Sequence, residues 1–276
     1  MDKKLIQSSN KIRLDVRSRY LRSMIVEGLI SSGRGHFGSA MSIIEILRVL
    51  YDSIIKFNSK KPQNDSRDIL IVSKGHGCLA LYALLADKGF FSKKELNKVG
   101  VINSMLGGHP EYKKIPGIEA STGALGHGFS IAVGSAISMK IRNKKNKVFV
   151  ILGDGEINEG SNWEAALSAS KHNLNNLHVI IDYNKWQATG KTDQILKLGN
   201  LKKKLESFGF LSNEIDGHNF TQISKNLKKK STNKPMAIIA HTIKGKGVSF
   251  MEDDNNWHYR SPNKKEYLEA IKEIDN

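Results

Sequence analysis

Four short, continuous runs of apolar residues, rich in β-branched side chains, constrain the fold of this chain more than any other feature. Each is followed by a segment whose apolar side chains have helical spacing. A strand that is apolar along its whole length must be covered on both faces, which is typical of parallel sheets in α/β proteins. The runs lie at 69–72, 148–152, 177–182 and 236–240, with a weaker one at 210–215. We therefore predict an α/β fold: a doubly wound parallel sheet with helices on both faces.

The segments between these runs predict the helices and the domain organisation. Helical spacing favours helices at 11–31, 41–57, 79–88, 128–139, 162–171, 201–208, 220–229 and 262–274, with Ser261 as the N-cap of the last one. The sequence contains no internal repeat and no low-complexity linker, and its five prolines are spread out. We expect one domain that spans residues 1–276.

Several classes of protein are excluded by simple counts. A single cysteine, Cys78, cannot form an internal disulfide or a cysteine-based zinc site. The longest apolar run, 129–139, is far shorter than the roughly 18–20 residues that a membrane span needs. The first residues, MDKKLIQSSNKIRLDVRSRY, have no apolar signal-peptide core, so we expect no membrane association and a cytoplasmic location.

A formal net charge of +16 raises the alternative of a basic nucleic-acid-binding module. The lysines are scattered, however, and no aromatic residues interleave the two dense clusters at 202–204 and 228–230 to make a stacking platform for bases. We expect the positive field to attract phosphorylated substrates or an acidic partner instead. A nucleic-acid-binding or non-catalytic protein remains the alternative from another functional class.

Polar residues follow two consecutive strands of the predicted sheet. Asp154, between two glycines, follows the run at 148–152, and Asn184 follows the run at 177–182. Adjacent parallel strands would bring both to one edge of the sheet, where ligands of such folds bind. Two side-chain oxygens, with a loop carbonyl just after Asn184, would hold a hard cation such as Mg²⁺ and leave room for a diphosphate. The chain has no Walker or Gly-x-Gly-x-x-Gly phosphate loop near these strands, so the pattern predicts a cation-bridged diphosphate site.

The whole stretch 153–190, GDGEINEGSNWEAALSASKHNLNNLHVIIDYNKWQATG, resembles the thiamine-diphosphate-binding motif of the transketolase family. Further segments resemble the family's other motifs and occur in the family's order: GHFGS at 35–39, SKGH at 73–76, GHPE at 108–111, STGALGHG at 121–128, TIKGKG at 242–247 and WH at 257–258. Two positions depart from the usual pattern, because Phe37 replaces a proline and His127 replaces a glutamine. The resemblance covers nearly the whole chain.

The resemblance implies a role for each matching residue. It assigns Asp154, the Asn184 side chain and the Trp186 carbonyl to the metal, which is Mg²⁺ with Ca²⁺ or Mn²⁺ as alternatives. It assigns His36, His76, His109 and His258 to catalysis, three of them (His36, His109 and His258) also to the sugar substrate, and Glu159 to a subunit interface. Contacts to thiamine diphosphate are implied for Ser39, His76, Gly123, Ala124, Leu125, Asp154, Gly155, Glu156, Asn184, Trp186, Lys244 and His258. We interpret the remaining buried or surface histidines His172, His178 and His218 as structural.

The same resemblance implies an incomplete active site. Transketolases use a second α/β domain, which binds the aminopyrimidine ring and supplies the activating glutamate, and no motif of that domain follows His258. The chain is therefore expected to be the N-terminal subunit of a split transketolase, active only with a C-terminal-type subunit, in a heterotetramer with two copies of each. The reaction implied is transfer of a two-carbon ketol unit from a ketose to an aldose, with sugars or sugar phosphates as substrates. The alternative is a thiamine-diphosphate-dependent synthase that acts on a modified sugar or an aldehyde and keto acid in polysaccharide synthesis.

Overall fold

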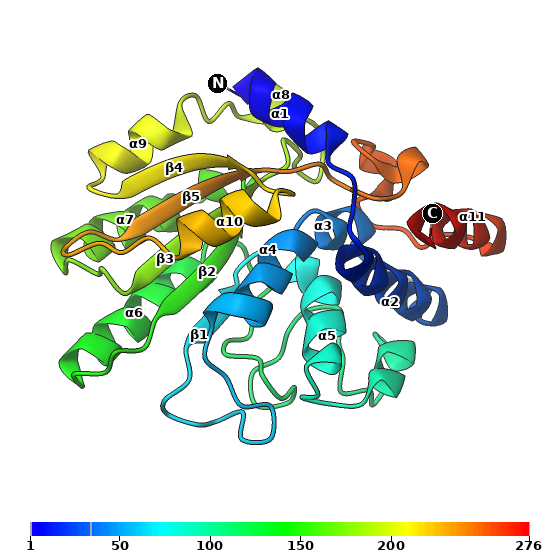
Figure 1. Ribbon diagram of the computed structural model, residues 1–276, viewed down its shortest axis with the longest axis horizontal. Coiled ribbons are helices and arrows are strands. Elements are labelled where there is room, and N and C mark those ends of the chain that lie inside the picture. The colour runs from blue at the N-terminus through cyan, green and yellow to red at the C-terminus, as the bar shows by residue number, and fades with distance from the viewer. Residues whose placement is uncertain (1, 34, 276) are drawn as a thin grey trace.

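The computed structural model describes residues 2–33 and 35–275, and its described strands form a single parallel sheet (Figure 1). The strand order is β1-β2-β3-β5-β4, and every neighbouring pair is parallel. The strands are β1 (Ile69–Val72), β2 (Val148–Gly153), β3 (Leu177–Tyr183), β4 (Leu211–Asp216) and β5 (Met236–His241). The predicted doubly wound α/β fold is confirmed, and all five predicted strands form.

Side chains of the sheet alternate between two apolar layers, as the continuous apolar runs predict. In β2, Phe149 and Ile151 belong to one buried cluster, whereas Val148, Val150 and Leu152 belong to the other. Burying both faces of the strands removes their apolar surface from water, which is the main force that stabilises such a sheet.

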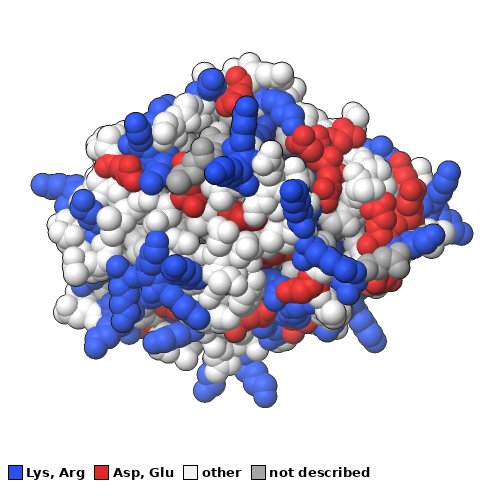
Figure 2. Space-filling view, turned by 45° about the horizontal axis from the view of Figure 1, so that its top comes forward, with Lys and Arg blue, Asp and Glu red and all other residues white. Residues whose placement is uncertain are grey.

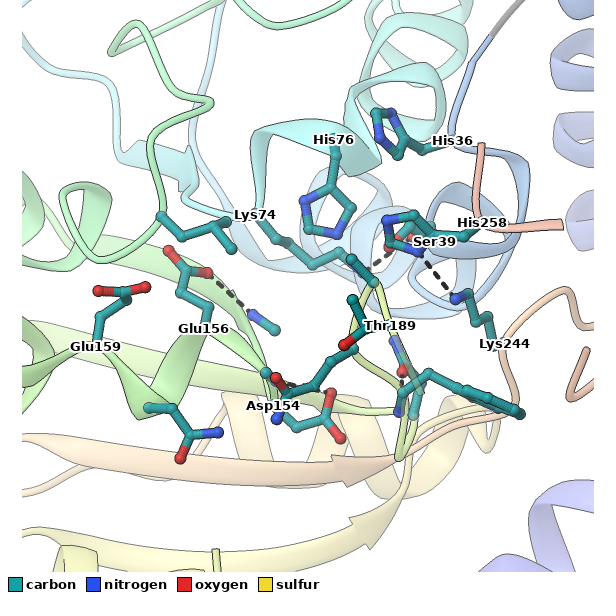
Figure 3. Close-up of a pocket in the computed structure, with 18 of the residues that line it drawn as sticks. His36, Ser39, Lys74, His76, Asp154, Glu156, Glu159, Thr189, Lys244 and His258 are labelled. Carbon is teal, nitrogen blue, oxygen red and sulfur yellow. Dashed lines mark hydrogen bonds between the residues drawn. The ribbon is translucent and has the colours of Figure 1, made fainter. Parts of the chain in front are cut away.

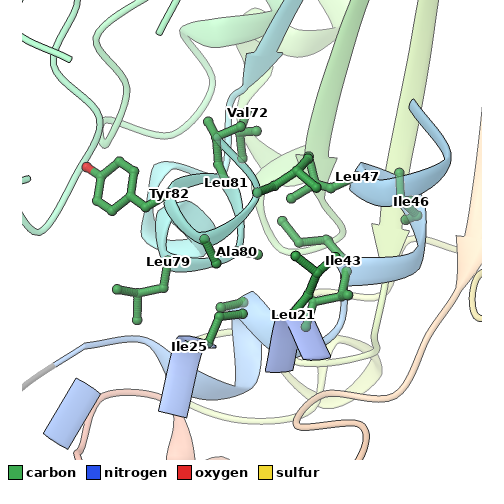
Figure 4. Close-up of a cluster of buried hydrophobic side chains, with 14 of the residues drawn as sticks. Leu21, Ile25, Ile43, Ile46, Leu47, Val72, Leu79, Ala80, Leu81 and Tyr82 are labelled. Carbon is green, nitrogen blue, oxygen red and sulfur yellow. The ribbon is translucent and has the colours of Figure 1, made fainter. Parts of the chain in front are cut away.

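Different helices cover the two faces (Figure 1). The first face packs against α2 (Val16–Ser32), α4 (Ile44–Val49), α5 (Cys78–Asp87) and α10 (Phe220–Leu227), with α3 (Phe37–Met41) and α11 (Lys264–Asp275) beside them. Figure 4 shows part of this layer, in which Leu21 and Ile25 of α2 lie against Leu79 and Ala80 of α5 and near Ile43. The second face packs against α6 (Gly128–Ile141), α7 (Gly160–Lys171) and α9 (Leu201–Ser207). The short helices α1 (Asp2–Lys11) and α8 (Thr192–Ile195) complete the α-helical elements of the described residues.

Three predicted helices differ from those observed. The helix predicted at 11–31 is α2, which begins only at Val16, because Asp15 accepts a hydrogen bond from the Ser18 N–H (2.9 Å) and caps it; α1 before it was not predicted. The segment 41–57 forms α4 and a π-helical turn, Leu50–Ile54, while Met41 is the last residue of the separate helix α3. The last helix begins at Lys264, and its cap is Asn263 instead of Ser261: Asn263 accepts from the Glu266 N–H (3.0 Å) and Glu266 accepts from the Asn263 N–H (2.8 Å).

The parallel register brings the predicted cation ligands to one edge of the sheet. Gly153 at the end of β2 is paired with Asp182 at the end of β3, so Asp154 and Asn184 both lie just beyond these ends. Short 3-10 turns follow at Gly75–Gly77, Glu156–Asn158 and Asn255–Trp257 and direct the loops around this edge. Within the described ranges, no helix combines the length and apolar character needed to cross a membrane.

Surface charge follows the scattered lysines of the sequence. Figure 2 shows Lys and Arg side chains spread over the face viewed, with one dense group at the lower left, while Asp and Glu gather mainly at the upper right. Several of the basic side chains are already paired, as Arg142 and Lys144 are with Asp65. Exposed pairs of this kind contribute little to stability but reduce the local positive field.

Candidate active site

A pocket of about 380 Å³ opens at the carboxyl ends of β1, β2 and β3 (Figure 3). Histidines and Lys244 lie on one side of it, and Asp154, Glu156 and Glu159 lie on the other. The lining residues come from every motif identified in the sequence: His36, Ser39, Lys74, His76, His109, Gly123, Leu125, Gly153, Asp154, Gly155, Glu156, Asn158, Glu159, Asn184, Trp186, Gln187, Ala188, Thr189, Lys244 and His258.

Asp154 is the central acidic group of the pocket. It is buried, and its carboxylate accepts hydrogen bonds from the Gly155 N–H (3.1 Å), the Lys185 N–H (2.8 Å) and the Thr192 hydroxyl (2.9 Å). Burial, together with the neighbouring Asp182 carboxylate, raises the pKa of Asp154 to about 7. So high a pKa means that too little positive charge surrounds this buried carboxylate. A bound divalent cation would supply that charge.

Asn184 and Asp182 form a connected pair beside Asp154. The Asn184 amide nitrogen donates to Asp182 Oδ2 (2.9 Å), and the amide oxygen accepts from the Trp186 N–H (3.0 Å). Asp182 also accepts from Lys74 Nζ (2.5 Å), and both of these charged side chains are fully buried. Asp182 and Lys74 were not predicted from the sequence as site residues.

Glu156 connects three loops below the pocket. One carboxylate oxygen accepts from the Ser73 hydroxyl (2.5 Å) and the Gly126 N–H (3.0 Å), and the other accepts from the Gly153 N–H (3.1 Å). Burial raises the pKa of Glu156 despite these donors. Its hydrogen bonds therefore hold the loop at 121–128 against the ends of β1 and β2. Glu156 thus has a structural role in addition to lining the pocket.

The four predicted catalytic histidines meet in one cluster. The His36 ring lies 5.3 Å from His76, 5.9 Å from His109 and 5.2 Å from His258, measured between ring centroids. Burial and neighbouring positive groups lower the pKa of His36 to about 3 and of His258 to about 4, and they hold the pKa of His76 well below its usual value. These three rings are thus neutral at physiological pH, so each carries one hydrogen-bond donor and one acceptor instead of titrating near pH 7.

Lys244 supplies a cation at the far side of the pocket from Glu159. Its ammonium donates to Asn255 Oδ1 (2.7 Å) and to His258 Nδ1 (3.0 Å). Burial and the ammonium of Lys74 lower the pKa of Lys244 to about 8. The charge of Lys74 is balanced by Asp182, so Lys244, beside neutral histidines, gives this side of the pocket the positive charge that suits phosphate groups.

Two glycines allow the loops to approach one another. A Cβ on Gly75 would lie 2.7 Å from the backbone nitrogen of Gly123, and one on Gly155 would lie 2.9 Å from Cγ of Gln187. Gly123 has a φ of +152°, which side chains rarely adopt, and it lies against His109. Gly75 and Gly123 are therefore required by the close packing of these loops.

Nearly all of the residues predicted for the site line this pocket. Ala124 is the exception: it is exposed and does not line the pocket, although its neighbours Gly123 and Leu125 do. His178 and His218 are buried elsewhere, His178 against Phe149 and His218 against Glu45. Sequence reasoning missed Lys74, Gly153, Asn158, Gln187, Ala188 and Thr189, although each lies within or directly beside a motif that had been identified.

The donor set of the pocket fits a hard cation bound through oxygen. No cluster of three or more His, Cys, Asp or Glu side chains in the described part of the chain is arranged to hold a metal. The set implied by the sequence is of another kind, with one carboxylate, one amide oxygen and one main-chain carbonyl. Oxygen donors of this type, with water and phosphate oxygens, are the usual environment of Mg²⁺.

Comparison with known proteins gives consistent matches. The family described as "Transketolase, thiamine diphosphate binding domain" matches residues 16–274. The chain is 42% identical to one of the subunits of the apulose-4-phosphate transketolase of Actinobacillus succinogenes, over 92% of each chain. It is 37% identical to a 6-deoxy-6-sulfo-D-fructose transketolase subunit of Clostridium sp., over 97% of this chain and 98% of that one.

Solved structures show the same fold over the whole chain. The transketolase of Campylobacter jejuni superposes with a TM-score of 0.88 at 29% sequence identity, and the match covers 100% of this chain. It covers 43% of the Campylobacter chain, so the present chain spans less than half the length of that enzyme.

Proposed function

The chain belongs to the transketolase family, as a thiamine diphosphate binding domain, and from this premise we propose that it is the N-terminal subunit of a split transketolase. Together with a C-terminal-type subunit, it transfers a two-carbon ketol unit from a ketose donor to an aldose acceptor. The enzyme is a transferase that is active only in the complex.

One observation carries this proposal. Asp154 and Asn184, which the sequence separates by a helix and a strand, lie at the ends of neighbouring strands in the same pocket as four histidines and two buried lysines. A cation site, a positive region for phosphate and a cluster of neutral imidazoles are the three features that binding thiamine diphosphate next to a polyhydroxylated substrate requires.

The roles of the residues are part of the proposal. Asp154, Asn184 and the Trp186 carbonyl hold the cation, and Lys244, His76, Ser39 and the glycine loops hold the diphosphate. When bound, thiamine diphosphate supplies the nucleophilic carbon needed to break and form a bond beside a carbonyl.

The histidines act on the sugar. His36, His109 and His258 bind its hydroxyls and assist proton transfer to and from them.

The substrate that we propose is a ketose that carries an anionic group. Two relatives that match this chain over nearly their whole length are named for apulose-4-phosphate and for 6-deoxy-6-sulfo-D-fructose, and each name contains an acidic substituent. The charge of +16 favours the approach of such a sugar. The proposed substrate therefore keeps the ketol transfer of a transketolase. It takes the modified sugar from the alternative hypothesis, the thiamine-diphosphate-dependent synthase.

The proposals for the partner, the metal, the assembly and the location rest on membership of the family. Both of these relatives are named as subunits, which supports a separate partner chain carrying the pyrimidine-binding domain. We further propose Mg²⁺ as the native metal, a heterotetramer with Glu159 at a subunit interface, and a cytoplasmic location. Glu159 is exposed at the edge of the pocket, which suits a contact with another chain.

Calorimetry tests the proposal directly. Thiamine diphosphate with Mg²⁺ is titrated into the chain alone, into its isolated partner and into their mixture, and ketol transfer is then assayed with sugar phosphates. We expect tight binding and transfer in the mixture. Ketose turnover by the chain alone would contradict the dependence on a partner, and the absence of binding in all three titrations would contradict the proposed function.

A matched pair of variants locates the site. Asp154→Asn removes the carboxylate proposed for the cation and should abolish Mg²⁺-dependent binding. Asp216→Asn changes an equally buried aspartate at the end of β4, which accepts from Ser8 and Ser9 away from the pocket, and should leave binding intact. Equal loss in both variants would mean that the effect is general destabilisation.

A further inference from the structure

Asn184 can serve a cation only if its amide oxygen, and not its amide nitrogen, faces the pocket. The two ends of an amide have nearly the same shape, so packing alone does not choose between them. We propose that Asp182, supported by the buried ammonium of Lys74, is a positioning residue that fixes the Asn184 amide with its oxygen available to the cation. This inference rests on the proposed function and adds to it the residues that preorganise the cation site.

Asp182 has the properties that this role requires. Its side chain is fully buried at the end of β3, and an ionised carboxylate only accepts hydrogen bonds. The Asn184 group that faces it must therefore be the NH₂, as observed at 2.9 Å. The amide oxygen is left on the opposite side, where it accepts from the Trp186 N–H at 3.0 Å and keeps a second lone pair.

Lys74 keeps the acceptor charged and in place. Its ammonium donates to Asp182 Oδ2 (2.5 Å) and to the Ser39 carbonyl (3.0 Å), and the Ser42 and Thr242 hydroxyls also donate to the Asp182 carboxylate. Donors from three segments distant in sequence thus converge on Asp182, in addition to the neighbouring Asn184. Figure 3 shows Lys74 reaching across the floor of the pocket toward Ser39.

The buried pair also has an electrostatic effect that must be separated from this geometric one. Removing Asp182 alone would take a negative charge away from the cation and leave Lys74 unpaired in the interior. Variants that change both residues keep the local net charge constant. In such a background, the charge is the same and the variants can differ in whether position 182 offers an acceptor to the Asn184 NH₂.

Two charge-balanced double variants form the test. Lys74→Met with Asp182→Leu has no acceptor for the Asn184 NH₂, whereas Lys74→Met with Asp182→Asn retains one. Each full-length chain is assembled with thiamine diphosphate and its partner subunit. Mn²⁺ is then titrated, and electron paramagnetic resonance of the free ion gives the dissociation constant and the number of sites.

We expect the Leu variant to bind Mn²⁺ about 10–100-fold more weakly than wild type, as is typical when a residue that orients a metal ligand is lost. The Asn variant should bind within a few-fold of wild type, and saturating Mn²⁺ should restore kcat in the Leu variant. A purely structural role would instead lower the number of sites and leave the dissociation constant unchanged.

Each other outcome overturns the inference. If both double variants are weakened equally, the ion pair itself is what matters, and if neither is weakened, Asn184 needs no orienting partner. Failure of the wild-type complex to bind Mn²⁺ would refute the proposed function, and the inference with it. Should the Leu variant not fold, Asp182→Val in the same Lys74→Met background removes the acceptor with a shorter side chain.

Discussion

Replacing Arg22 by methionine should destabilise this protein more than any surface substitution on the same helix. Arg22 is fully buried in α2 and forms a two-pronged ion pair with Glu45 of α4, at 2.6 and 3.0 Å. Its other N–H groups donate to the carbonyls of Lys246 (2.7 Å), Met41 (3.1 Å) and Ser18 (3.3 Å). Arg22 thereby ties α2 to α4 and to the loop that carries Lys244.

The expected magnitude follows from what the substitution leaves behind. Methionine fills much of the volume but leaves the buried Glu45 carboxylate without its cation, and breaking such a pair costs about 3–5 kcal/mol. At about 2.1 cal/mol/K of unfolding entropy per residue, a chain of 276 residues changes its Tm by about 1.7 °C per kcal/mol. We therefore expect Arg22→Met to lower the Tm by about 5–9 °C.

The pH dependence gives an independent check with a definite sign. Although burial opposes it, the Arg22 guanidinium and His218 hold the pKa of Glu45 well below its usual value of 4.5. The stabilisation is therefore fully present above pH 4.5 and is lost as the pH falls toward the lower pKa of the folded state. The difference in stability between wild type and Arg22→Met should accordingly shrink below pH 4.5.

Thermal unfolding followed by circular dichroism, at pH 7 and at steps down to pH 4, measures both effects. Arg17→Met is the matched control, because Arg17 lies on the same helix but pairs with Asp52 and Asp87 near the surface. Its loss should cost about 1 kcal/mol or less. The reasoning would be refuted if the two variants had the same Tm, or if the deficit of Arg22→Met did not decrease with falling pH.

Three other results are expected. Gly75→Ala would place a Cβ against the backbone of Thr122 and Gly123, so the affinity for thiamine diphosphate, measured by calorimetry, should fall by about tenfold or more. Gly134→Ala is the control: a Cβ there meets open space, so the affinity should be unchanged. Burial raises the pKa of Cys78 to about 12, so iodoacetamide at pH 8 should label Cys78 only after denaturation, as detected by mass spectrometry. Rapid labelling of the native protein would contradict this burial. Since the pKa of His36 is lowered to about 3 and that of His258 to about 4, their ring resonances in NMR spectra of the ligand-free chain should show no imidazole titration with a midpoint near 6.5. Such a midpoint would contradict the clustered arrangement.

The neutral histidines change what the site is expected to do. An imidazole with its ordinary pKa titrates near neutral pH, but burial and the lysines of the pocket lower the pKa of His36, His76 and His258. A ring with so low a pKa is a weak base, so these histidines suit hydrogen bonding to sugar hydroxyls better than holding a proton at pH 7. Burial is the main cause of the lowered pKa values, and the Lys74 ammonium adds to it in each case.

Some features were fixed by local sequence alone. The apolar runs determined the sheet, because an unbroken apolar strand of about five residues is stable only between two covering layers. Asp154 and Asn184 were predicted to meet because parallel connectivity returns consecutive strands to the same edge, as the pairing of Gly153 with Asp182 confirms. The cap at Asn263 also had a local signal, an Asn followed three residues later by Glu266, which the sequence analysis overlooked in favour of Ser261.

Other features depended on segments that are distant in sequence. Lys74 and Asp182 lie 108 positions apart, and nothing near either residue indicates that they pair inside the protein. The break of the segment 41–57 and the pKa values of the histidines likewise depend on which loops pack against them. Side-chain periodicity is a property of neighbours along the chain, so the sequence determined the elements and the motif residues of the site. Desolvation and charge depend on neighbours in space, so only the tertiary structure decided how those residues are ionised and oriented.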